Sequence, residues 1–128
     1  MTIFRRAAAP RRNLRREGAL GEEIAAGFLA RHGYRIIERN FRFRRSGEID
    51  IVARDGEDLV FCEVKMRSSD AFGLPEEAVT PSKQRRIRKI AAAYLAVNRI
   101  AGRACRFDVV SIRSGAGPPE ISLFRDAF

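Results

Sequence analysis

Residues 47–67 read GEIDIVARDGEDLVFCEVKMR, and this stretch decides the fold. Apolar and polar residues alternate on both sides of a short polar segment, which is typical of two half-buried strands joined as a hairpin. The turn is either Asp55-Gly56 or Gly56-Glu57, and both are acceptable two-residue hairpin loops. The two turns differ by two residues in the pairing of the strands, and the sequence alone leaves both open.

Three charged side chains share one face of this hairpin. Because side chains alternate between the faces of a strand, Asp50 is expected beside Glu48 and Val52, and Glu63 beside Lys65. A shift of two residues does not move a side chain to the other face. Asp50, Glu63 and Lys65 therefore converge with either turn.

Two facing carboxylates raise each other's pKa, and a divalent cation compensates the repulsion. Hard oxygen ligands suit Mg²⁺ or Mn²⁺, which lower the pKa of bound water and stabilise charge on a phosphoryl oxygen. Lys65 would orient the attacking water or stabilise the transition state. The pattern equally fits a solvated strand face in which Glu48 pairs with Lys65, so both interpretations stay open here.

A helix precedes the hairpin. Apolar residues recur at helical spacing over residues 19–31, and Gly33 is a natural stop. Glu22 lies at the edge of the apolar stripe and is predicted to reach the sheet, whereas Glu23 is predicted to face water. His32, the only histidine, is expected at the surface or as a cap and not in catalysis.

A mixed sheet is predicted around these elements. Residues 34–43 are expected to form a first strand, with Asn40 as an irregularity. Thr80 and Pro81 predict the start of a second helix, as N-cap and first helical residue. Two further strands are expected at residues 106–112 and 121–124. The predicted fold class is α/β, with a central mixed β-sheet flanked by helices.

The chain is strongly basic. Its 128 residues carry 25 Lys and Arg against 16 Asp and Glu, a net charge of +9 that suits a polyanion such as nucleic acid. An anionic membrane surface would also suit this charge, but nucleic acid is the expected partner and no membrane is; no apolar run approaches the roughly 20 residues that span a bilayer. Residues 1–16 are predicted to be a basic flexible arm, with a transit peptide as the lesser alternative, and residues 17–128 one domain. Cys62 and Cys105 fit no metal-ligand spacing and are predicted to be buried, reduced thiols of a cytoplasmic protein.

The charged residues of the hairpin match a known signature. Asp50, twelve residues, and then Glu63-Val64-Lys65 resemble the D-x(n)-E-x-K motif of the restriction-endonuclease-like superfamily. Over residues 18–128 the chain is similar to the YraN-like family of small bacterial proteins, predicted endonucleases distantly similar to archaeal Holliday junction resolvases. The matching positions are Gly21-Glu22, Gly33-Tyr34, Asn40, Gly47-Glu48-Ile49-Asp50, residues 61–65, Arg67, Lys83 and Phe107-Asp108.

The resemblance implies a restriction-endonuclease-like fold and a site for Mg²⁺ or Mn²⁺. The implied metal ligands are Glu22, Asp50, Glu63 and the backbone carbonyl of Val64. Lys65 would be the catalytic lysine, acting with Asp50 and Glu63.

The predicted function is metal-dependent hydrolysis of phosphodiester bonds in DNA, with branched or damaged DNA as substrate classes. Paired cuts in a junction would require a homodimer. The alternative is a non-catalytic nucleic-acid-binding module, or a subunit of a repair complex, that keeps the fold. Besides the basic arm, the expected contacts with nucleic acid are Arg42, Arg44, Arg45, Arg67, Lys83, Gln84 and Arg86. For Lys83 and Gln84 a plain basic helix face is the other interpretation.

Overall fold

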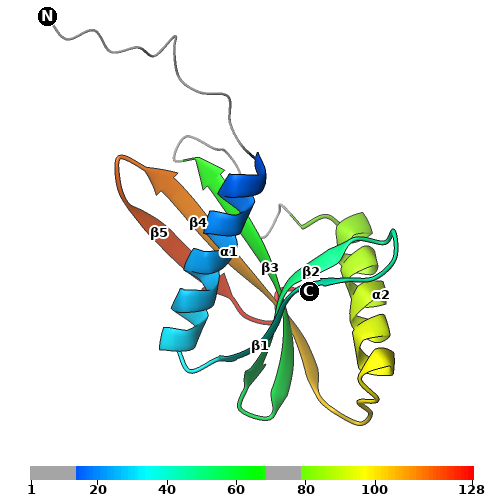
Figure 1. Ribbon diagram of the computed structural model, residues 1–128. Coiled ribbons are helices and arrows are strands. Elements are labelled where there is room, and N and C mark those ends of the chain that lie inside the picture. The colour runs from blue at the N-terminus through cyan, green and yellow to red at the C-terminus, as the bar shows by residue number, and fades with distance from the viewer. Residues whose placement is uncertain (1–13, 69–78) are drawn as a thin grey trace, which may run out of the picture.

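The computed structural model describes residues 14–68 and 79–128, with side chains from Gly18 onwards (Figure 1). Two helices and five strands follow the predicted order: α1 (Leu14–Arg31), β1 (Arg35–Arg42), β2 (Glu48–Asp55), β3 (Asp58–Ser68), α2 (Pro81–Val97), β4 (Cys105–Gly115) and β5 (Gly117–Phe124). The strands form one sheet in the order β1-β2-β3-β4-β5. Only the β3–β4 pair is parallel among these strands, because α2 lies in the connection between them.

The α/β class and the mixed sheet flanked by helices are confirmed, and the arrangement is consistent with a restriction-endonuclease-like fold. Neither α1 nor α2 is long and apolar enough to cross a membrane.

The core has two layers, one on each face of the sheet. Ile90 of α2 packs with Phe61 and Val109, whereas Leu29 of α1 packs with Val60 and Val110. Neighbouring residues of β4 are therefore buried on opposite faces. This explains why the apolar pattern of that strand indicates no single inward side.

The helix and strand bounds differ from the prediction where packing is thin. α1 begins at Leu14, inside the segment expected to be an arm; the rest of that segment lies outside the described residues. Nothing lies within 4 Å of a Cβ added at Gly18, and Leu20 is 53% exposed, so packing is thin at these two positions of α1. β5 begins at Gly117, earlier than expected. Cys105 is exposed at the start of β4, which corrects its predicted burial, while Cys62 is buried; neither forms a disulfide.

The register of the hairpin decides between the two possible turns. Val52 pairs with Phe61 and Asp55 with Asp58, which leaves Gly56 and Glu57 in the turn. Gly56 has φ 61°, a left-handed backbone that favours glycine. The Gly56-Glu57 alternative is therefore the observed one.

The irregularity predicted at Asn40 is present and turns two strands at once. Asn40 has φ 57°, between the pairs Arg39↔Ile51 and Phe41↔Ile49. Ile51 packs on the α1 side of the sheet, but Ile49 packs on the α2 side. The regular alternation of faces expected for this strand would put both isoleucines on one face, and it fails here because the left-handed residue rotates β1 and its partner β2 follows.

The far half of the β1–β2 hairpin consequently lies against α2, as Figure 1 shows. The Phe41 and Tyr94 rings meet edge to face, with centroids 5.1 Å apart. A Cβ added at Gly47 would stand 3.7 Å from the Arg86 Nε atom. The hairpin and the first turns of α2 are thus brought together around residues 47–50.

A buried polar network fixes the turn between β2 and β3, at the opposite end of β2. Asp108 is 0% exposed and accepts hydrogen bonds from Tyr34 Oη (2.8 Å) and Arg106 Nε (2.9 Å). The same guanidinium reaches Asp55 at 2.8 Å and Asp58 at 3.1 Å, on either side of the hairpin turn. Arg106 therefore ties β4 to the turn between β2 and β3.

Arg106→Ala is expected to lower the free energy of unfolding by about 3–5 kcal/mol, because it leaves Asp108 buried without its cation. Urea unfolding followed by circular dichroism measures the change. Arg113→Ala, on the same strand but half-buried, is the matched control and should cost no more than about 0.5 kcal/mol. Equal midpoints for the two variants would contradict the structural role of Arg106.

Candidate functional site

The candidate site lies where β2 leaves β3. The backbone pairing between β2 and β3 runs from Asp55↔Asp58 to Ile51↔Cys62 and does not extend to Asp50. Instead, the backbone N–H of Val64 donates to Asp50 Oδ2 at 2.8 Å. The aspartate thus replaces a partner in the ladder and is fixed between the two strands.

Three carboxylates converge at this point. Ligand atoms of Glu22, Glu48 and Asp50 all lie within 4.8 Å of one another. Glu22 comes from α1, in the position expected from the helical pattern, while Glu23 is exposed and pairs with Arg39 at 2.9 Å. The sequence placed Glu48 on the face of Asp50 but did not assign it as a ligand.

Glu63 completes the acidic group and binds two lysines. Its side chain is 9% exposed, with Oε1 2.8 Å from Lys83 Nζ and 3.5 Å from Lys65 Nζ. It also interacts directly with the carboxyl group of Asp50. Asp50, Glu63 and Lys65 are therefore close together, as predicted, although Glu63 is turned towards the lysines.

The second helix places Lys83 in this site. Thr80 is the N-cap, and its side chain accepts a hydrogen bond from Lys83 N at 3.3 Å. Lys83 was expected to contact nucleic acid, but its ammonium group is engaged with Glu63 inside the site. The signal for it was available in the sequence, since the Thr80-Pro81 cap puts Lys83 in the first turn of α2.

Of the other residues expected to bind nucleic acid, four are exposed and two are half-buried. Arg42, Arg44 and Arg45 are exposed at the end of the β1–β2 hairpin, and Arg86 is exposed next to Gly47. Gln84 donates instead to the carbonyl of Val79 at 3.0 Å, which closes the start of α2. Arg67 is half-buried near the end of β3.

Most of the chain matches a known protein family. The model of the uncharacterised protein family UPF0102 matches residues 21–112. The chain belongs to the UPF0102 family. The match confirms the family resemblance inferred from the sequence, and its residues include the site from Glu22 to Lys83.

Curated relatives agree over most of their length. A UPF0102 protein of Syntrophus aciditrophicus is 51% identical over 113 residues, which is 88% of each chain. One from Moorella thermoacetica is 55% identical over 98 residues, covering 77% of this chain and 81% of its own. One from Geobacter sulfurreducens is 54% identical over 112 residues, 87% of each chain.

The electrostatics of the UPF0102 site are those of crowded carboxylates. Burial, and then the negative charge of Glu63, raise the pKa of Asp50 to about 7, against the opposing hydrogen bond from Val64 N–H. Burial and a hydrogen bond with Lys83 lower the pKa of Lys65. Burial alone would also lower the pKa of Lys83, but its hydrogen bonds to Glu63 and Lys65 raise it.

These residues fit a hard divalent cation. Glu22, Glu48, Asp50 and Glu63 offer carboxylate oxygens, the donors that Mg²⁺ and Mn²⁺ prefer. Four carboxylates face two ammonium groups and the guanidinium of Arg42, whose Nε lies 4.0 Å from Glu48 Oε2, so the ionised cluster carries an excess of one negative charge in a half-buried place. A divalent cation is of the sign and size to balance it.

The raised pKa of Asp50 predicts how stability depends on pH. Between about pH 4 and 7, the folded state keeps a proton on Asp50 that the unfolded chain has already released. The stabilisation of the folded state by this proton is therefore lost as pH rises through 7. Asp50→Asn, measured in a chelator, should therefore be on the order of 2 kcal/mol more stable than wild type at pH 8 and about equal to it at pH 4.

Urea midpoints at pH 4, 6 and 8 measure this difference. Glu57→Gln, in the exposed turn, is the matched control and should keep the wild-type slope. If Asp50→Asn is less stable than wild type at pH 8, Asp50 does not carry the unfavourable charge described here.

Proposed function

We propose that this UPF0102 protein is a metal-dependent endonuclease that hydrolyses phosphodiester bonds in DNA. The observation that carries the proposal is the convergence of four carboxylates from α1, β2 and β3 with Lys65 and Lys83. Isolated acidic residues on a strand face water, whereas these meet where β2 leaves β3 and the ladder is open.

Glu22, Glu48 and Asp50 would hold the metal ion, with Glu63 and the Val64 carbonyl as the further ligands implied by the superfamily motif. Such an ion supplies Lewis-acid activation of water and neutralises charge on a phosphoryl oxygen. Asp50 is suited to be a metal ligand of fixed orientation, because the Val64 N–H donates a hydrogen bond to one of its oxygens.

The two lysines act on the substrate side of this group. Lys65 Nζ lies 3.5 Å from Glu63 Oε1, and the neighbouring Lys83 competes for the same oxygen at 2.8 Å. Lys83 thus holds Glu63 in place, which leaves Lys65 to orient the attacking water and to stabilise the negative charge of the transition state.

The exposed arginines next to the site supply the binding surface. Arg42, Arg44 and Arg45 surround the end of the β1–β2 hairpin, which also carries Glu48 and Asp50. Their positive charge would attract the phosphate backbone and offset the acidic site. Together with the net charge of +9, this arrangement favours a nucleic-acid substrate.

Cleavage of DNA in Mg²⁺ or Mn²⁺ tests the proposal. Single-stranded, duplex and four-way-junction DNA are incubated with wild type, Asp50→Asn, Glu63→Gln and Lys65→Ala. Wild type is expected to cut at least one of the three, and each variant to lose at least about 100-fold in rate, since each removes charge stabilisation in the transition state.

Glu57→Gln is the control for these variants and should cut like wild type, because its side chain is exposed in the turn away from the site. If wild type binds DNA but cuts none of the substrates, and the three variants bind as well as wild type, the protein is a non-catalytic binding module instead.

Phosphate contacts by the hairpin arginines predict a specific salt dependence. The logarithm of the DNA-binding constant should fall linearly with the logarithm of salt concentration, and Arg44→Ala and Arg45→Ala should each reduce the slope by about 1. Fluorescence anisotropy with labelled duplex measures the slopes. Arg113→Ala is the control, and an equal slope change in it would show that these arginines act only through net charge.

A further inference from the structure

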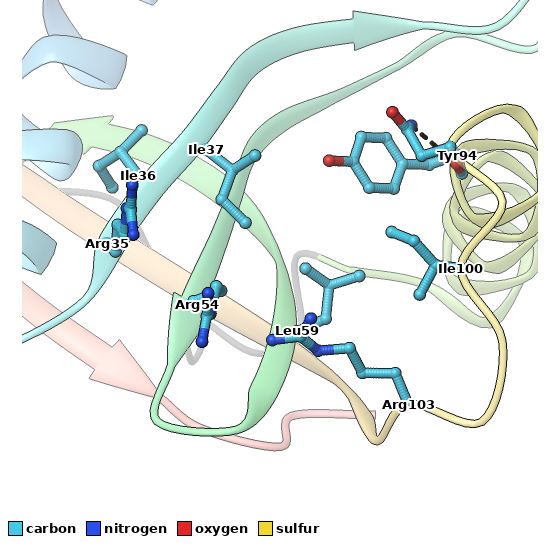
Figure 2. Close-up of a pocket in the computed structure, with 9 residues that line it drawn as sticks. Arg35, Ile36, Ile37, Arg54, Leu59, Tyr94, Ile100 and Arg103 are labelled. Carbon is cyan, nitrogen blue, oxygen red and sulfur yellow. Dashed lines mark hydrogen bonds between the residues drawn. The ribbon is translucent and has the colours of Figure 1, made fainter.

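A second, basic cavity lies at the opposite end of α2. It has a volume of about 500 Å³, within the range of about 300–1,000 Å³ usual for ligand sites. Figure 2 shows Tyr94 and Ile100 on the α2 side, Ile37 and Arg54 on the sheet side, and Arg103 next to Leu59.

The cavity is separate from the proposed nuclease site. Arg54 and Leu59 lie four residues along β2 and β3 from Asp50 and Glu63, or about 13 Å at 3.3 Å per residue. The contact between Phe41 and Tyr94 closes the space between the two places. A ligand in this cavity would therefore not contact the carboxylates of the proposed nuclease site.

Three arginines give the cavity an unbalanced positive charge. Arg35, Arg54 and Arg103 line it, and none of them forms an ion pair with a carboxylate of the described residues. Arg103 uses its Nε to bind the backbone carbonyl of Glu57 at 3.2 Å. The paired strands bring Arg35 and Arg54 opposite each other, so two like charges stand together without an acid between them. Such a pair is stabilised by an anion.

A tyrosine hydroxyl that reaches the open space also faces this cavity. Tyr94 is 3% exposed, and its phenol forms no hydrogen bond with the described residues, although its carbonyl accepts one from Asn98 at 2.9 Å. In Figure 2 the hydroxyl points towards Ile37 across the cavity. Burial, and then the charge of Glu38, raise the pKa of this phenol, so it remains a donor. The hydroxyl is open to the cavity and unbonded to the described residues, so it is free to donate to a ligand.

The remaining walls are apolar. Ile37 is a large hydrophobic residue that is 44% exposed, and Leu59 and Ile100 stand near it in the cavity. A ligand that fits must therefore combine an anionic group for the arginines, a flat or apolar body for the isoleucines and a polar edge for Tyr94 and Asn98. A phosphate, by itself, matches only the first of these requirements.

We propose that this cavity binds one nucleotide unit, with its phosphate on Arg35, Arg54 and Arg103 and its base between Ile37, Ile100 and Tyr94. The nucleotide is either a free mononucleotide or one residue of a nucleic-acid strand, since the same groups are presented by both. Asn98 keeps its side-chain oxygen free as an acceptor for an amino group of the base, because only its Nδ2 is used towards Tyr94.

Titration with deoxyadenosine 5′-monophosphate, followed by amide NMR signals, tests the proposal. Signals of residues lining the cavity, such as Leu59, Tyr94 and Ile100, should shift and saturate. Arg54→Ala should weaken binding at least fivefold, and Arg113→Ala, the matched control, should leave it unchanged. Tyr94→Phe should weaken it about threefold while leaving the urea midpoint within error, because the hydroxyl has no partner to lose.

Three further titrations complete the test. Inorganic phosphate should bind at least tenfold more weakly than the nucleotide, and Asp50→Asn should bind the nucleotide like wild type. A single-stranded hexanucleotide distinguishes the sources: tighter binding that Arg54→Ala removes assigns the site to a strand, and equal or weaker binding assigns it to a free nucleotide.

The proposal is overturned if the nucleotide shifts no signal of the cavity, or if phosphate alone binds equally well. It is also overturned if Arg113→Ala weakens binding as much as Arg54→Ala does. None of these results bears on cleavage by the site around Asp50, which the Asp50, Glu63 and Lys65 variants test by themselves.

Discussion

The hydrogen bond from Val64 N–H to the carboxylate of Asp50 is the interaction on which the site depends. It forms where the ladder between β2 and β3 stops, and it holds the two strands together without a regular backbone pair. The opened space admits Glu22 from α1 and Lys83 from α2, which approach from opposite faces of the sheet. A regular hairpin would leave no opening in which Glu22 of α1 and Lys83 of α2 could approach the same carboxylates.

The position of this opening follows from the backbone of Asn40. Its left-handed conformation rotates the far half of the β1–β2 hairpin onto α2, and the apolar contacts of Phe41 and Ile49 with that helix stabilise the rotation. At the other end of β2, Arg106 ties the turn between β2 and β3 to β4 through Asp55, Asp58 and Asp108. β2 is thus fixed at both ends, so the carboxylates near it stay close together. Burial and their mutual repulsion raise the pKa of Asp50.

Much of this arrangement was predictable from local sequence. The two-residue period of residues 47–67 and the Thr80-Pro81 cap indicated the strands and the start of α2, because they depend on neighbouring residues. The alternation of faces predicted that Asp50, Glu63 and Lys65 lie close together, which is observed although the alternation itself breaks between Ile49 and Ile51, and Glu22 followed from the helical stripe. These are properties that the chain carries within one or two elements.

Other features depend on tertiary contacts that no local pattern carries. Asparagine tolerates a left-handed backbone without requiring it, so the face switch between Ile49 and Ile51 could not be inferred from Asn40. The contact of Lys83 with Glu63 depends on where α2 crosses the sheet, and the cavity around Tyr94 depends on the same crossing. Glu48 was on the right face, but only the position of Glu22 identified it as a partner.

The central claim is that the carboxylates around Asp50 hold a divalent metal ion, and Mn²⁺ tests it most directly. The ion is paramagnetic and broadens amide NMR signals near the place where it binds. At substoichiometric Mn²⁺ we expect the strongest broadening at Glu22, Glu48, Asp50 and Val64, and its loss in Asp50→Asn. Broadening centred on Asp55 and Asp58, or broadening that is unchanged in Asp50→Asn, would contradict the account.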